Sequence, residues 1–117
     1  PVVTKDELLN LIQEARAVEA NDRIFDYITT LAEATRTHPM VELGVSPRGA
    51  LALCRMAKAH AFLAGRDFVV PEDVAAVFPD VCAHRLILSA KARMMEEKAE
   101  NILAEILKSV DMPVLKA

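Results

Sequence analysis

Aromatic side chains are scarce in this sequence of 117 residues: they make up 4% of it, and tryptophan is absent. Hydrophobic residues still account for 53% of the chain, so the interior has to be built from Leu, Ala, Val, Ile and Met. This composition favours packed helices. A chain of this length is large enough for one core and too small for two, so we expect residues 1–117 to form a single domain.

An excess of positive charge is also missing. The formal net charge is -3, which argues against a domain that holds nucleic acid through its overall electrostatics. No run of about 18 apolar residues occurs, and no charged segment precedes a short hydrophobic stretch. We therefore expect neither a membrane span nor a signal peptide.

Cysteine is limited to Cys54 and Cys82, each inside an apolar segment. Buried free thiols fit this setting better than a disulfide, and they fit a reducing cytoplasm. Together with His60 and His84 the cysteines lack the spacing of zinc ligands, and nothing marks an activated Cys-His pair. The sequence therefore predicts no metal site and no cysteine catalysis.

A phosphate-binding loop of the form G-x-x-x-x-G-K-[ST] is absent from the sequence. Such a loop wraps its backbone N–H groups around the phosphates of a nucleotide. The chain alone is therefore not expected to cradle a triphosphate.

Helix boundaries are marked by capping residues, prolines and one glycine. Thr4 and Glu7 form a capping box, Asp22 is placed to cap a second helix, and Ser46 is followed by Pro47 at the first helical position. Gly65 is placed to end the third helix in the left-handed conformation. These and similar signals predict helices over residues 4–17, 22–38, 47–64, 71 to 79 or a little beyond, and 89–110.

Two short segments have β-like composition, Phe68–Val70 and Arg85–Leu88, and we expect them to pair in a minimal ribbon. Residues 40–45 between the second and third helices should form a loop that pivots on Gly44. The predicted fold is mainly α: a small bundle of about five helices with one two-stranded β ribbon.

An arginine in the stretch "GVSPRGAL" calls for an explanation. Arg48 falls in the first turn of the third helix, which is the positive end of the helix dipole, so a cation there is unfavourable by a few tenths to about 1 kcal/mol. An anion would offset this cost. The helix start already favours an anion, and a guanidinium adds a bidentate phosphate ligand. The alternative is a surface arginine that simply points into water.

Four stretches in this order resemble the C-terminal lid domain of MoxR-type AAA+ ATPases. They are "ATRTHP" at residues 34–39, "LGVSPRGALAL" at 43–53, "AKAHAFLAGRDFVVPEDV" at 57–74 and "CAHRLIL" at 82–88. Lids of the chelatase and replicative helicase branches are similar. The sequence departs from the pattern at Val70, where a capping threonine is frequent, and at Cys82, where an aliphatic residue is usual.

The resemblance implies that Arg48 is the sensor 2 arginine, which reaches the γ-phosphate of ATP held with Mg²⁺ on a separate core domain. By the same resemblance Pro47 would pack near the adenine, and Tyr27 and Ile28 would line the lid side of its pocket. An ordinary half-buried helix face would also account for Tyr27 and Ile28.

Further implications concern partners. A lid of this family hinges against its own AAA+ core and contacts neighbouring subunits in a ring, usually a hexamer. Such ATPases act as chaperones on partner proteins, including proteins with a von Willebrand factor A domain. The competing hypothesis is a free-standing helical protein-interaction module without a nucleotide role.

Overall fold

The computed structural model describes residues 3–114 of the chain. Six α-helices, one short 3-10 helix and a two-stranded sheet make up this part, which confirms a small, mainly α lid-like fold. The elements in order are α1 (Lys5–Arg16), α2 (Asp22–Thr37), β1 (Val41–Leu43), α3 (Pro47–Leu63), α4 (Pro71–Cys82), η1 (Ala83–Arg85), β2 (Ile87–Leu88), α5 (Ala90–Met94) and α6 (Ala99–Ser109).

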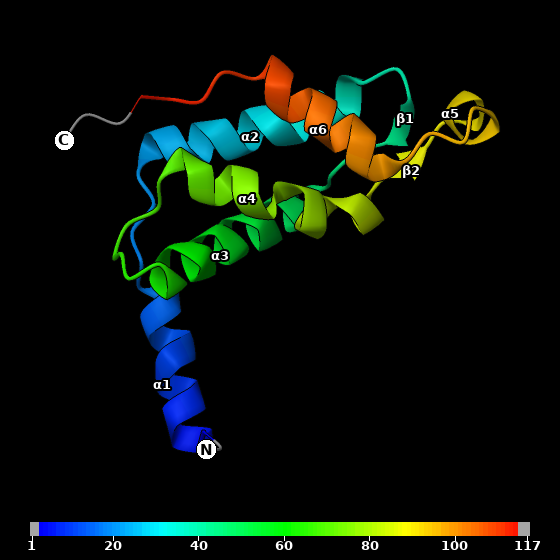
Figure 1. Cartoon of the computed structure of the whole chain (residues 1–117). Helices are drawn as coiled ribbons and strands as arrows, with labels where there is room; N and C mark the ends of the chain where they lie inside the picture. The colour runs from blue at the N-terminus through cyan, green and yellow to red at the C-terminus, as the bar shows by residue number, and fades with distance from the viewer. Residues whose placement is uncertain (1–2, 115–117) are drawn as a thin grey trace.

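Helices α2, α3, α4 and α6 form the body of the molecule (Figure 1): α4 packs against both α3 and α6, and α2 contacts each of the other three. Their apolar faces meet in one core, whose largest fully buried side chains include Phe78, Ile24, Leu31, Leu53 and Ile102. The alanines of α3 allow close contact, since Ala57 and Ala61 are completely buried. Apart from Phe78 and Tyr27, the interior is therefore filled by aliphatic and small residues, as the composition predicted.

Helix α1 projects away from this body (Figure 1). Its predicted capping box is confirmed: the Glu7 amide donates to Thr4 Oγ1 at 3.1 Å, and the Thr4 amide donates to Glu7 Oε1 at 3.3 Å. No residue of α1 is buried. The segment after α1 is held by a parallel bridge, in which the Glu19 amide donates to the Asp67 carbonyl and the Val69 amide to the Glu19 carbonyl.

The second helix is capped by Asn21 rather than by Asp22. Asn21 Oδ1 accepts a hydrogen bond from the Ile24 amide at 3.1 Å, and Asp22 is the first helical residue. Asparagine and aspartate are both good N-cap residues, so the predicted cap was wrong by one position. The predicted end of the helix is confirmed, because His38 already has an extended conformation.

The predicted ribbon exists with a different pairing. Ile87–Leu88 pairs antiparallel with Val41–Leu43, so residues 40–45 are not a loop throughout. Phe68 instead bridges Glu19. The prediction was wrong because composition identifies extended segments but not the partner that the packing of helices brings beside them.

The last predicted helix is interrupted. Ser89 caps α5 as expected, with its Oγ accepting from the Ala92 amide at 3.1 Å. The chain then turns at Glu96, which has φ 56°, and α6 starts only at Ala99. The Glu97 amide donates to the Ala92 carbonyl and the Glu96 amide to the Arg93 carbonyl. This is a Schellman termination with glutamate in place of the usual glycine, which the apolar periodicity does not reveal.

Gly65 ends α3 as predicted, at φ 83°. A Cβ at this position would meet nothing within 4 Å, so the cost of a side chain is purely conformational. We expect Gly65→Ala to destabilise the domain by on the order of 1 kcal/mol, measured by urea unfolding of the 117-residue chain. Gly65→Asn should cost less, since asparagine tolerates the left-handed region better. An unchanged or raised midpoint for the alanine variant would contradict the assignment.

Candidate functional site at the start of helix α3

The chain that leads into α3 is fixed to the last turns of α2. Thr35 is buried; its Oγ1 donates to the Ala32 carbonyl at 2.6 Å and accepts from the Val45 amide at 2.9 Å. Arg36 Nε donates to the Val45 carbonyl at 2.8 Å. A Cβ on Gly44 would lie 2.7 Å from the Arg36 amide nitrogen. Only glycine permits this approach, so these residues together set where α3 begins.

The first turn of α3 has the predicted geometry. Ser46 is the N-cap, its Oγ accepts from the Gly49 amide at 3.2 Å, and Pro47 occupies the first turn. Among residues 3–114 the Arg48 amide has no acceptor. The turn contains no acidic residue. It therefore presents one free N–H group at the positive end of the helix.

Arg48 and Pro47 are both exposed. Within the described part of the chain the Arg48 guanidinium takes part in no ion pair or hydrogen bond. Residues 3–114 thus hold a cation at a positive helix end without supplying the anion that would offset its cost.

Two further arginines lie beside this turn, and sequence reasoning did not select them. Arg36 is held through Nε at Val45, and Arg85 Nε donates to the Val81 carbonyl at 3.0 Å. A Cβ on Gly49 would lie 3.3 Å from Arg85 Cδ, so the Arg85 side chain runs along the start of α3. The terminal Nη atoms of Arg36 and Arg85 form no hydrogen bond within residues 3–114. Arg36 lies in the motif "ATRTHP" and Arg85 in "CAHRLIL", but no local sequence signal places either of them next to α3.

Tyr27 and Ile28 lie in the core, with 3% and 4% of their surface exposed. The Tyr27 hydroxyl is buried and has no hydrogen-bond partner in the described chain. Burial, with a smaller contribution from Glu72, raises the pKa of Tyr27. Neither residue shares an open surface with Arg48, so their role at an adenine stays a prediction.

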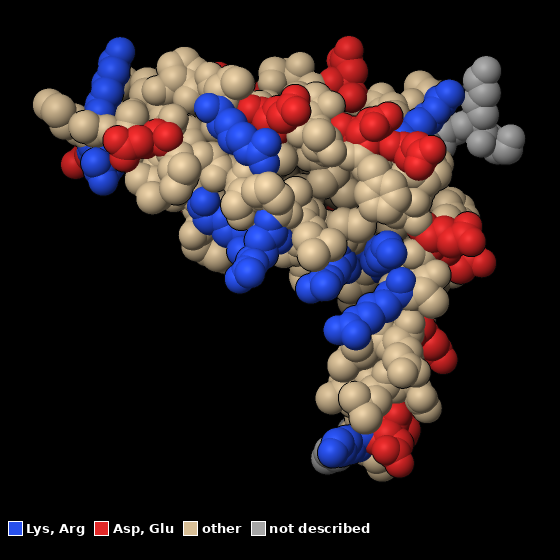
Figure 2. Space-filling model, turned by 180° about the vertical axis from the view of Figure 1, so that it is seen from behind, with Lys and Arg blue, Asp and Glu red and all other residues tan. Residues whose placement is uncertain are grey.

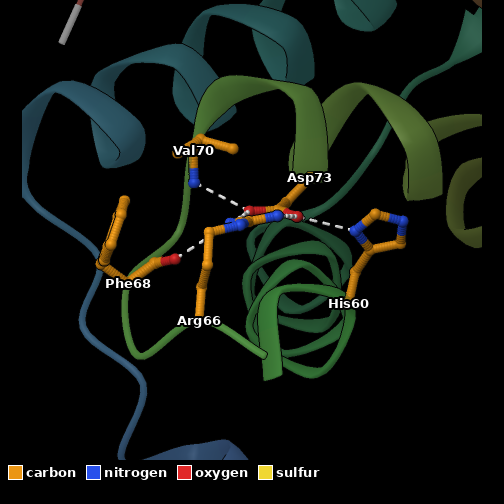
Figure 3. A network of polar contacts seen from close by, with 5 residues as sticks. All are labelled: His60, Arg66, Phe68, Val70 and Asp73. Carbon is orange, nitrogen blue, oxygen red and sulfur yellow. Dashed lines mark hydrogen bonds and ion pairs between the residues drawn. The ribbon is translucent and has the colours of Figure 1, made fainter. Parts of the chain in front are cut away.

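A second polar cluster ties the end of α3 to the start of α4 (Figure 3). The Asp73 carboxylate is fully buried and accepts hydrogen bonds from both Nη atoms of Arg66, at 2.6 and 2.7 Å. It also accepts from the Val70 amide at 2.8 Å, and it lies 2.7 Å from His60 Nδ1. All four residues of this cluster lie in the stretch "AKAHAFLAGRDFVVPEDV" at residues 57–74, so their contacts explain part of that motif.

Burial raises the pKa of Asp73, but the hydrogen bonds from Arg66, Val70 and His60 together outweigh it, and the pKa is lowered overall. Val70 has no side-chain acceptor, so the Asp73 carboxylate alone provides the cap contact at this helix start. Because the carboxylate is enclosed, it is a structural group that holds α3 and α4 in register.

Both cysteines are free and buried, as predicted. Burial raises the pKa of the Cys82 thiol to about 11, so this thiol is protonated and unreactive near neutral pH. In residues 3–114 no three His, Cys, Asp or Glu side chains gather as a metal site would require. None of the described helices combines the length and the apolar character needed to cross a membrane.

The family model of the AAA lid domain matches residues 33–106. Among curated proteins, the chain is 40% identical to the uncharacterized protein YeaC of Bacillus subtilis over 117 residues, which is the whole chain and 37% of that protein. It is 31% identical to the chaperone MoxR1 of Mycobacterium tuberculosis over 125 residues, 99% of the chain and 33% of that protein.

Among solved structures, the crystal structure of a "putative ATPase" from Cytophaga hutchinsonii superimposes with a TM-score of 0.89 at 32% identity. The similarity covers 94% of this chain and 36% of that one. The chain thus spans about a third of the length of these relatives.

Proposed function

Because the chain belongs to the AAA lid domain family, and is a lid of the MoxR type, we propose that it closes over ATP bound on a core domain elsewhere in the same protein. The core would supply the phosphate loop and the Mg²⁺ ligands, neither of which the lid sequence contains. The lid would supply Arg48 as the sensor 2 arginine.

The observation that carries this proposal is the unpaired Arg48 at the capped start of α3. The γ-phosphate of ATP is an anion of the right kind, since a guanidinium and a helix N-terminus both bind phosphate oxygens. Arg36 and Arg85 support the proposal because their anchored guanidinium groups add positive charge beside the same turn. Pro47, exposed next to Arg48, would contact the adenine side of the nucleotide.

Arg48 would couple hydrolysis to motion of the lid. A γ-phosphate contacted from the lid favours a closed angle between lid and core, and loss of that phosphate removes the preference. In a ring of such subunits, a hexamer for example, each change of angle would shift the neighbour. We propose that a cytoplasmic enzyme of this kind remodels client proteins, including proteins with a von Willebrand factor A domain.

The purified 117-residue chain should neither hydrolyse ATP nor bind it tightly. The reason is that most of the affinity for a triphosphate comes from a phosphate loop and Mg²⁺, which this part of the protein does not provide. Phosphate release and calorimetric titration with ATP·Mg²⁺ check this directly. Turnover above that of a mock purification would contradict the assignment as a lid.

The alternative remains a helical protein-interaction module that never meets ATP. It predicts that the full-length gene encodes no G-x-x-x-x-G-K-[ST] loop and that Arg48 is dispensable. Reading the sequence upstream of Pro1 separates the two functions: a phosphate loop followed by an acidic metal-binding motif supports the lid.

A further inference from the structure

Helix α1 contacts α3, but the described chain leaves much of its apolar face exposed. Leu8, Leu9, Leu11 and Ile12 are each between 39% and 52% exposed. A single helix of 12 residues is marginal in water without tertiary contacts. The exposed face therefore requires a partner surface. Because α1 projects from the body as an arm, a partner can reach this face (Figure 1).

A groove of about 540 Å³ lies between α1 and α3, at the inner corner where the arm meets the body. Its apolar part consists of Ile12, Leu51 and Cys54, with small alanines beside them. Its polar part consists of three cations, Arg16, Arg55 and Lys58. No carboxylate from the described part of the chain lines it.

The accumulation of cations here is notable in a chain with 17 acidic and 14 basic residues. In Figure 2, Lys and Arg side chains gather where the projecting helix joins the body, and acidic side chains lie on the opposite side of the arm. Within residues 3–114, Arg16 and Arg55 form no ion pair, and Lys58 Nζ contacts only the Arg16 carbonyl, at 3.4 Å. Unpaired like charges repel one another, so an acidic partner would relieve this repulsion.

The groove continues the face of α3 that carries Arg48. Arg48, Leu51, Arg55 and Lys58 are spaced by three, four and three residues, which places them along one side of the helix. Whatever domain holds the phosphate opposite Arg48 therefore also faces the groove.

We propose that the groove between α1 and α3 seats an acidic, amphipathic segment of the nucleotide-binding core of the same protein. An apolar side chain of that segment would enter between Ile12 and Leu51, and its carboxylates would pair with Arg16, Arg55 and Lys58. The length of the relatives favours this occupant, because about two thirds of each lies outside the matched part. The proposal rests on the proposed function and adds where the core docks and by what chemistry.

Hydrogen exchange tests this docking in the absence of nucleotide. Amides of residues 5–16 should exchange at least about 10-fold more slowly in the full-length protein than in the 117-residue chain. Arg55→Glu combined with Lys58→Glu should restore fast exchange in the full-length protein. Lys91→Glu combined with Arg93→Glu changes the charge equally at the exposed α5 and should leave the protection intact.

Equal exchange of residues 5–16 in the two wild-type proteins would overturn the proposal, and so would protection that survives charge reversal in the groove. Light scattering on the 117-residue chain should show a monomer. A dimer that protects residues 5–16 would assign the groove to a second copy instead.

The docking test is independent of the sensor role. Arg48→Ala should keep the protection of α1 without nucleotide, whatever its effect on ATP turnover. If Arg48→Ala hydrolyses ATP normally and α1 remains protected from exchange, Arg48 is not the sensor but the docking site is still supported.

Discussion

Arg48→Ala in the full-length protein is expected to slow ATP hydrolysis by roughly 10²- to 10³-fold, the scale on which one preorganised electrostatic donor acts at a developing charge. The structure predicts that folding is nearly unaffected. The Arg48 side chain is exposed and its guanidinium forms no hydrogen bond or ion pair within residues 3–114, and its removal takes a cation away from a positive helix end. The melting temperature of the isolated lid should therefore stay constant or rise slightly.

Two further measurements make the assignment specific. ADP lacks the γ-phosphate, so its affinity should be nearly the same in the wild type and in Arg48→Ala. Arg48→Lys should recover little activity, because an ammonium keeps the charge but loses the bidentate geometry of the guanidinium. Arg93→Ala, which removes an exposed arginine from α5, serves as the matched control and should hydrolyse ATP normally. Near-normal turnover by Arg48→Ala would rule out the sensor role.

Asp73→Asn should cause a large loss of stability, about 3 kcal/mol or more. The buried carboxylate accepts hydrogen bonds from the Arg66 guanidinium and the Val70 amide, and it lies beside His60 Nδ1. An asparagine offers one acceptor oxygen and leaves the Arg66 charge without its counter-ion. Partial exposure of Arg66, at 29%, keeps the expected value near the low end for a broken buried pair.

Urea unfolding of the 117-residue chain measures this effect. Glu72→Gln is the matched control, since Glu72 is exposed on the same helical turn, and it should change the free energy of unfolding by less than about 0.5 kcal/mol. A loss below about 1 kcal/mol for Asp73→Asn would show that the cluster does not hold α3 to α4.

The acid dependence of stability provides a second readout. Because the pKa of Asp73 is lowered on folding, its contribution is complete above the unfolded value of about 3.9 and is lost as the pH falls through the native pKa. The wild type should therefore lose stability in this acidic window, and Asp73→Asn should lack that part of the loss.

The helix starts could be predicted because their signals are local. Three helices begin at a side-chain oxygen that accepts a hydrogen bond from the amide three residues later, on Thr4, Ser46 and Ser89. The residue type alone therefore predicts the N-cap. Gly65 predicts the end of α3 from a single residue as well, since its missing Cβ allows the left-handed conformation. Glu96 adopts that conformation without being glycine, and the break between α5 and α6 therefore gave no signal in the sequence.

Arg48 was found from its own turn of helix, but its surroundings depend on packing. Arg85 reaches the start of α3 only because η1 follows α4 across the body, and β1 meets β2 across more than forty residues of sequence. The exposure of the apolar side chains of α1 likewise follows only from where the other helices lie. Hydrogen bonds within one helical turn join residues that are close in the sequence. The sequence by itself therefore determined the helix starts and the position of Arg48 in the first turn of α3. Contacts between distant segments depend on how the apolar faces pack together, so only the tertiary structure decided the ribbon, the arginines around Arg48 and the groove beside α1.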